Sequence, residues 1–139
     1  MARSTILTVS GAAAFSAWSL AVAQPPNALA QAAPGLYEIA GLPGAKAPAR
    51  ECIGDVTVLG QFEHRRSNCT RKILSSSGNS VTMNYQCAGG GFGQSKLTVI
   101  TPRNLRVETQ GISDSLPFNY ILQARRVGEC AAKPPAIIH

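Results

Sequence analysis

The chain has 139 residues, of which 13 are basic and 7 are acidic, so its formal net charge is +6. This length suits one domain with a modest hydrophobic core. The basic residues are scattered in short groups, and the pattern around them predicts neither a groove-reading helix nor an aromatic platform, which argues against nucleic-acid binding. A surface of this kind fits simple solvation, or contact with anionic lipid headgroups or acidic glycans.

An export signal is predicted over residues 1–23. Arg3 gives a positive start, residues 5–23 carry no charge, and Ala21-Val22-Ala23 is a small-x-small site that signal peptidase accepts. A second such site, Ala28-Leu29-Ala30, offers an alternative cut after residue 30. The other interpretation is a retained membrane anchor, because a membrane span needs about 20 apolar residues. The stretch is only weakly hydrophobic, however, so we expect a cleaved signal and a periplasmic protein. Because the predicted cleavage site has no cysteine beside it, a lipoprotein is not expected.

The first elements after the signal are short. Residues 24–34 are rich in Pro, Ala and Gln, and we predict that they form a flexible lead-in. Period-2 patterns predict strands over residues 36–40 and 49–53. Residues 55–61 are predicted to form one or two helical turns with Asp55 as the N-cap.

A hairpin is the clearest predicted element. Residues 68–75 and 80–87 flank the turn 76–79, in which Gly78 and Asn79 tolerate the positive φ of a tight turn. Centring the hairpin on Gly78 places Cys69 opposite Cys87. A register slip of one residue would move one cysteine to the wet face, so register and cysteine pairing support each other.

Three further strands are predicted over residues 94–101, 104–111 and 116–127, each alternating between apolar and polar residues. This alternation is typical of antiparallel sheets with one solvated face. Residues 35–130 are therefore predicted to form an all-β domain with a minor helix and two disulfides. We expect an antiparallel meander of six or seven strands, curled or closed into a small barrel. Residues 131–139 are predicted to be a disordered tail.

Four cysteines, Cys52, Cys69, Cys87 and Cys130, allow three disulfide pairings. The hairpin register favours Cys69–Cys87, which leaves Cys52–Cys130, and Cys52–Cys69 with Cys87–Cys130 remains as the alternative. The spacing lacks the close cysteine pairs of structural zinc sites and the Cys-x-x-Cys of redox sites. We therefore predict disulfides outside the cytoplasm, with neither a metal nor a cofactor.

No catalytic residue is predicted. The two histidines and seven acidic residues are spread singly, and the sequence contains neither a Gly-x-Ser-x-Gly elbow nor a His-Glu-x-x-His zinc motif. His64 is expected on the surface. The glycine-rich run 89–93 lacks the Lys-Ser/Thr of a phosphate loop, so we predict a flexible connection with Phe92 as an exposed apolar contact.

Four stretches of the sequence form a recognisable set: Pro34-Gly35-Leu36-Tyr37-Glu38-Ile39, Glu51-Cys52-Ile53, the hairpin from Asn68 to Cys87, and Ala124-Arg125-Arg126-Val127-Gly128-Glu129-Cys130. Together they resemble a bacterial exported family catalogued as domain of unknown function 3617. The resemblance covers residues 34–130. Tyr37 departs from the tryptophan usual at its position, and the segment between the first two strands is shortened. The resemblance implies a periplasmic location and carries no catalytic residue across.

The favoured functional hypothesis is a non-catalytic binding module for an apolar or anionic ligand of the cell envelope. Its predicted ligand-facing residues lie on the inner face of the curled sheet and at its rim: Met83, Tyr85, Phe118 and Tyr120, with Arg125 and Arg126. A structural or protein-interaction domain is the alternative, and it predicts a packed interior with an exposed apolar patch or edge strand around Tyr37 or Phe92. An enzyme is the least favoured hypothesis, because it would need His64 beside Asp55 or Glu63 in a cleft.

Overall fold

The computed structural model describes residues 11–14 and 27–131. Nearly all of the predicted export signal, its cleavage site after Ala23 and the tail from residue 132 lie outside these residues. Within the described part of the chain, no helix is both long and apolar enough to span a membrane.

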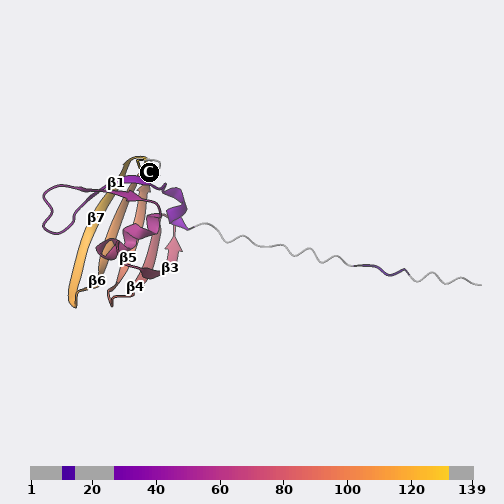
Figure 1. Cartoon of the computed structure of the whole chain (residues 1–139). Coiled ribbons are helices and arrows are strands. Elements are labelled where there is room, and N and C mark those ends of the chain that lie inside the picture. Colours follow the sequence, from indigo (N-terminus) through magenta and orange to yellow (C-terminus); the bar gives the residue numbers. More distant parts are fainter. Residues whose placement is uncertain (1–10, 15–26, 132–139) are drawn as a thin grey trace, which may run out of the picture.

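Seven strands form a single antiparallel sheet in the order β2-β1-β7-β6-β5-β4-β3 (Figure 1). The strands are β1 (Gly35–Ala40), β2 (Ala49–Ile53), β3 (Cys69–Ser77), β4 (Ser80–Cys87), β5 (Phe92–Thr101), β6 (Asn104–Ser113) and β7 (Leu116–Gly128). Helical structure in the described residues is limited to two 3₁₀ elements, η1 (Ala28–Gln31) and η2 (Val56–His64). The predicted all-β class with minor helix is therefore confirmed.

The predicted curled sheet or barrel is wrong, and the meander is incomplete. Strands β3 to β7 do follow one another as neighbours, but β7 then pairs with β1, and β2 and β3 lie at opposite edges of an open sheet. The connection from β2 to β3 crosses the whole sheet and carries η2 across one face (Figure 1). Because η2 covers the apolar face, the sheet buries that face without having to close on itself.

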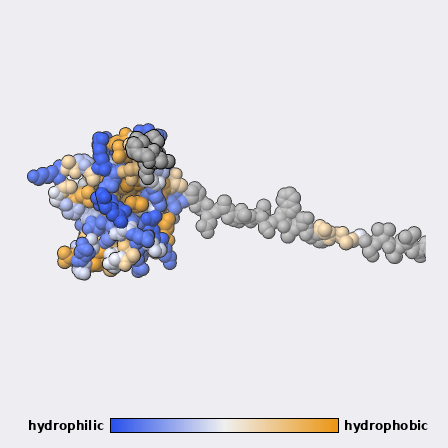
Figure 2. Space-filling model, viewed as in Figure 1, coloured by the Kyte–Doolittle hydropathy of each residue, from blue (hydrophilic) through white to orange (hydrophobic). Residues whose placement is uncertain are grey.

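The helical cover η2 begins where the sequence predicted. Asp55 is its N-cap, and the Asp55 side chain accepts a hydrogen bond from the Thr57 amide at 2.9 Å. Leu59 and Phe62 are fully buried against the sheet, and the Ser95 hydroxyl of β5 donates to the Gly60 carbonyl at 2.5 Å. Figure 2 shows hydrophilic residues over much of the face turned to the viewer, with hydrophobic residues between them.

The predicted flexible lead-in over residues 24–34 is wrong for its second half. Residues 28–31 form η1, which packs on β4 and β5, and Ala28 and Leu29 are 3% and 5% exposed. The Ala28 amide donates to the Ser76 hydroxyl of β3 at 3.3 Å. The period-2 search missed this turn because its apolar residues are too few to show any periodicity. Cleavage after Ala30 would remove both residues from the core.

The hairpin of β3 and β4 has the predicted register. Cys69 lies opposite Cys87 and Ile73 opposite Met83, and a two-residue turn at Gly78-Asn79 joins the strands. The structure joins Cys69 to Cys87 and Cys52 to Cys130, with Cα–Cα distances of 3.9 and 5.4 Å. This is the pairing that the hairpin register favoured. Two disulfides indicate an oxidising, extracytoplasmic location.

Candidate functional site

The predicted ligand-facing aromatic residues lie in the packed core instead. Met83, Tyr85 and Tyr120 are 0%, 1% and 8% exposed, and Phe118 packs partly buried against the same core. Their strands do turn these side chains to one face, as the alternation predicted. That face is covered by η2, so these four side chains stabilise the fold, although Tyr85 and Phe118 also contribute to the lining of a hollow on the sheet that is described below.

The buried tyrosine hydroxyls are paired with residues at the end of η2. The Tyr120 hydroxyl donates to the Glu63 carboxylate at 2.6 Å, and the Tyr85 hydroxyl lies 3.0 Å from His64 Nδ1. Burial raises the pKa of both tyrosines far above the ordinary value, and the Glu63 carboxylate adds to both increases. The His64 ring also packs edge-on against Tyr85 and Phe118, so His64 is partly buried rather than on an open surface.

The two predicted rim arginines point to opposite faces of β7. Arg125 lies on the exposed face and donates to Glu38 at 2.8 Å, whereas Arg126 donates to the Pro34 carbonyl at 2.8 Å. Hydrogen bonds from Arg125 and then from Arg50 lower the pKa of Glu38. The structure therefore gives each arginine its own partner and does not bring them together as an anion site.

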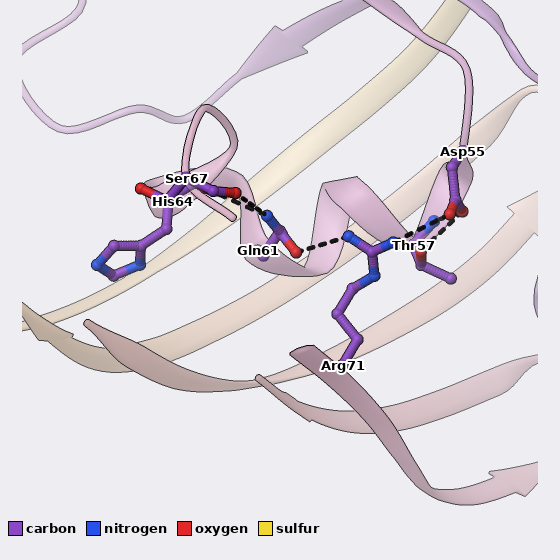
Figure 3. A network of polar contacts seen from close by, with 6 residues as sticks. All are labelled: Asp55, Thr57, Gln61, His64, Ser67 and Arg71. Atoms are coloured by element: carbon purple, nitrogen blue, oxygen red, sulfur yellow. Dashed lines mark hydrogen bonds and ion pairs between the residues drawn. The ribbon is translucent and has the colours of Figure 1, made fainter. Parts of the chain in front are cut away.

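A polar network fastens η2 to the edge strand β3 (Figure 3). The Arg71 guanidinium donates to Gln61 Oε1 at 2.7 Å and to Asp55 Oδ2 at 3.1 Å. The Gln61 amide group, which is buried, donates in turn to the His64 carbonyl at 3.2 Å. These contacts link both ends of η2 to one side chain of β3, and they assign Arg71 a structural role.

Replacing the N-cap by Asp55→Ala is expected to lower the free energy of unfolding by about 1 kcal/mol at pH 7, because the Thr57 amide loses its acceptor. Asp55→Asn keeps an acceptor and should cost less. Hydrogen bonding to the Thr57 hydroxyl, with Arg71 nearby, lowers the pKa of Asp55. The charge-dependent stability is therefore present above the unfolded-state pKa and is lost as the pH falls through the folded-state pKa. Urea titrations at several pH values should show the difference between wild type and Asp55→Asn vanishing in acid; a constant difference would contradict this account.

A row of four carboxamides crosses the exposed face of the sheet, opposite η2. The backbone register aligns one carboxamide from each of β4, β5, β6 and β7, and all four residues are exposed: Asn84, Gln94, Gln110 and Asn119. Neighbouring strands are about 4.8 Å apart, so the row presents amide groups at that repeat. We call these four residues the amide row.

A second row runs parallel to the amide row and is mainly apolar. It consists of Gln86, Phe92, Ile112 and Pro117, which are also aligned by the register. Phe92 is 49% exposed. Between the two rows lies a hollow of about 680 Å³, which we call the amide groove.

Two glycines form the floor of the amide groove. Gly93 and Gly111 are paired between β5 and β6, and because they alternate with the residues of the two rows, a side chain at either position would point to the η2 side of the sheet. A Cβ at Gly111 would collide with the Phe92 carbonyl oxygen, and a Cβ at Gly93 would lie 2.6 Å from the Tyr85 hydroxyl oxygen. Glycine is thus required at both positions by close packing beneath the groove.

A smaller hollow of about 470 Å³ lies on the other side of the amide row. Its far wall carries Lys96 and Glu108, which are opposite each other on β5 and β6. The amide row is therefore a ridge between two hollows, and ligands on either side can reach it. The amide groove has uncharged walls, whereas the smaller hollow has one charge of each sign.

The sequence analysis did not identify the four amide-row residues as a site. Their alignment depends on the register of four strands, of which only the first hairpin was predicted in detail. Phe92 was correctly expected to be exposed, but it begins β5 instead of belonging to a flexible connection. The signal available in the sequence was the recurrence of Asn or Gln on the polar face of each predicted strand.

The sequence is similar to a described protein family. Residues 32–130 match a family model described as "Protein of unknown function (DUF3617)". No curated protein and no solved structure matches the chain. The matched region contains all seven strands, η2 and both disulfides.

Proposed function

The chain belongs to the family of unknown function DUF3617, and from that premise we propose that it is a periplasmic, non-catalytic binding module whose ligand lies in the amide groove. Export by a cleaved signal would bring the four cysteines into the oxidising compartment where disulfides persist. The groove is the one observation that carries the binding function.

The size and lining of the amide groove support ligand binding. Its volume of about 680 Å³ lies within the range of about 300–1,000 Å³ that is usual for small-molecule sites. Such sites combine apolar walls with a few polar groups that fix orientation. Here the mainly apolar row from Gln86 to Pro117 supplies the apolar wall, and the amide row supplies the polar groups.

The ligand supported by this lining is uncharged. All of the residues lining the groove are uncharged, and Arg125 is six residues along β7 from Asn119, about 20 Å away. An anionic headgroup in the groove would therefore have no guanidinium within reach, and the neighbouring cations, Lys72 opposite Asn84 and Lys96 in the smaller hollow, lie outside the groove lining. Of the two ligand types expected from the sequence, the groove favours one with apolar surface and does not favour the anionic one.

Protein interaction through the edge strand β3 is the second candidate function. Ile73 and Leu74 are 41% and 46% exposed on this strand, and an exposed apolar edge is able to pair with another chain. Tyr37, named for this role from the sequence, is fully buried. The register shift between Ile73 and Ser75 interrupts the edge, which weakens it as a template for strand addition.

The binding proposal is tested by nuclear magnetic resonance on the oxidised protein with four probes. These are N-acetylglucosamine tetrasaccharide, a polygalacturonate oligomer, lysophosphatidylglycerol below its micelle concentration, and an uncharged hexapeptide. At least one probe is expected to shift the backbone amides of residues 84–86, 92–94, 110–112 and 118–119.

A matched pair of variants on one face of β7 provides the control. Asn119→Trp fills the amide groove and should weaken binding at least about tenfold, whereas Gln123→Trp, four residues away on the same face, should leave it unchanged. Shifts confined to Arg125 or to β3, or no shift with any probe, would overturn the proposal.

A further inference from the structure

We propose that the amide groove binds a linear, uncharged oligosaccharide, an inference that rests on the proposed binding function and specifies its ligand. It depends on three properties of the groove: the hydrogen-bonding capacity of the amide row, its repeat across the strands, and the apolar wall beside it.

The amide row has unused hydrogen-bonding capacity. Each carboxamide carries an NH₂ donor and a carbonyl acceptor, and none of the four side chains hydrogen-bonds to another protein group among the described residues. A sugar hydroxyl likewise both donates and accepts. A row of carboxamides can therefore bind successive hydroxyls in either direction, without any charge on protein or ligand.

The repeat of the row distinguishes a saccharide from an extended peptide. The carboxamides recur at the strand spacing of about 4.8 Å, whereas a β-strand repeats its equivalent groups every two residues, at about 6.6 Å. A peptide lying along the groove would therefore fall out of step with the row. One pyranose ring is close in length to one strand spacing, so a linear chain of rings can place one ring near each carboxamide. Because successive β-1,4-linked rings are turned over, the same ring edge then faces every second carboxamide, which remains in step with the row.

The opposite wall suits the apolar faces of sugar rings. Phe92, Ile112 and Pro117 present carbon surface along the groove, and about half of Phe92 is exposed. Ring C–H groups can pack on this wall by dispersion while hydroxyls at the ring edge reach the amide row.

The test is calorimetric titration of the full oxidised protein with two tetrasaccharides, one of N-acetylglucosamine and one of β-1,4-linked glucose. Binding by the first alone assigns recognition to the acetamido groups, and binding by both assigns it to the ring hydroxyls. Affinity should rise from mono- to tetrasaccharide, because the row spans four strands. It should also change less than about twofold between low salt and 0.5 M NaCl, because no ionic contact is made.

Single substitutions locate the contacts. Gln110→Ala and Asn119→Ala should each weaken tetrasaccharide binding roughly 3- to 10-fold by removing a hydrogen-bonding group. Phe92→Ala should weaken it by a similar factor, and Gln123→Ala should have no effect. All four positions are partly or fully exposed surface sites, so circular dichroism is expected to be unchanged and a folding defect would be detected separately.

The outcomes separate this inference from the function on which it rests. If the hexapeptide or the lysolipid shifts the groove amides and neither tetrasaccharide does, the oligosaccharide is wrong and the binding function stands. A strong salt dependence, or tetrasaccharide binding that survives both Asn119→Trp and Phe92→Ala, also overturns the oligosaccharide inference. If no probe reaches the groove, both proposals fail.

Discussion

Replacing Cys52 and Cys130 together by serine is expected to lower the free energy of unfolding by about 4 kcal/mol. This bridge joins residues 78 apart in the sequence, and closing a loop of that length in the unfolded chain removes about that much conformational entropy. Both sulfurs lie near the protein surface, so the serine variant leaves little cavity. Guanidinium unfolding followed by circular dichroism measures the loss.

The second bridge provides the comparison. Cys69–Cys87 closes a loop of 18 residues, so the corresponding double serine variant should lose about 3 kcal/mol. The smaller loop is nested inside the larger one and shortens its effective length. The stability losses of the two double serine variants should therefore differ by less than the loop lengths alone would give. Reduced wild type should unfold like the variant lacking all four cysteines. A loss below about 1 kcal/mol for Cys52→Ser/Cys130→Ser would contradict the assigned role of this bridge.

The strands and the hairpin were predictable because their signals are local. Leu97 and Val99, or Leu105 and Val107, alternate with polar neighbours within one strand, and that alternation alone places them on the buried face. Cys69 and Cys87 followed from the position of a single turn. In each case the determining residues lie close together in the sequence.

The open sheet and the amide groove were not predictable in this way. Whether the sheet closes into a barrel depends on whether another element covers its apolar face. The sequence of η2 predicts a helical turn but does not indicate that this turn lies across the sheet between β2 and β3. The groove depends on the register of four strands joined by three separate turns, and an error of one residue at any turn would break the row. Tyr85 and Phe118 were expected to face a ligand because the alternation of a strand is the same for a core face and for a cavity wall. Only the position of η2 over that face distinguishes the two, and this position was not predicted.

The clearest test of that cover is Phe62→Ala, which is expected to lower the free energy of unfolding by about 3–5 kcal/mol. Phe62 is fully buried between η2 and the sheet, and the Arg65 guanidinium lies 4.2 Å from its ring centre. The truncation removes both the apolar contact and the cation–π contact. Because η2 fills the role that barrel closure would otherwise serve, its loss should also increase binding of a hydrophobic dye to the native-state ensemble.

Val58→Ala is the matched control, since Val58 lies on the same helical element but is only partly buried. Its cost should be below about 1.5 kcal/mol, with no gain in dye binding. A cost for Phe62→Ala no greater than that of Val58→Ala would mean that η2 contributes little to holding the apolar face. In that event burial by η2 would not explain why the sheet remains open, and another element would have to cover its apolar face.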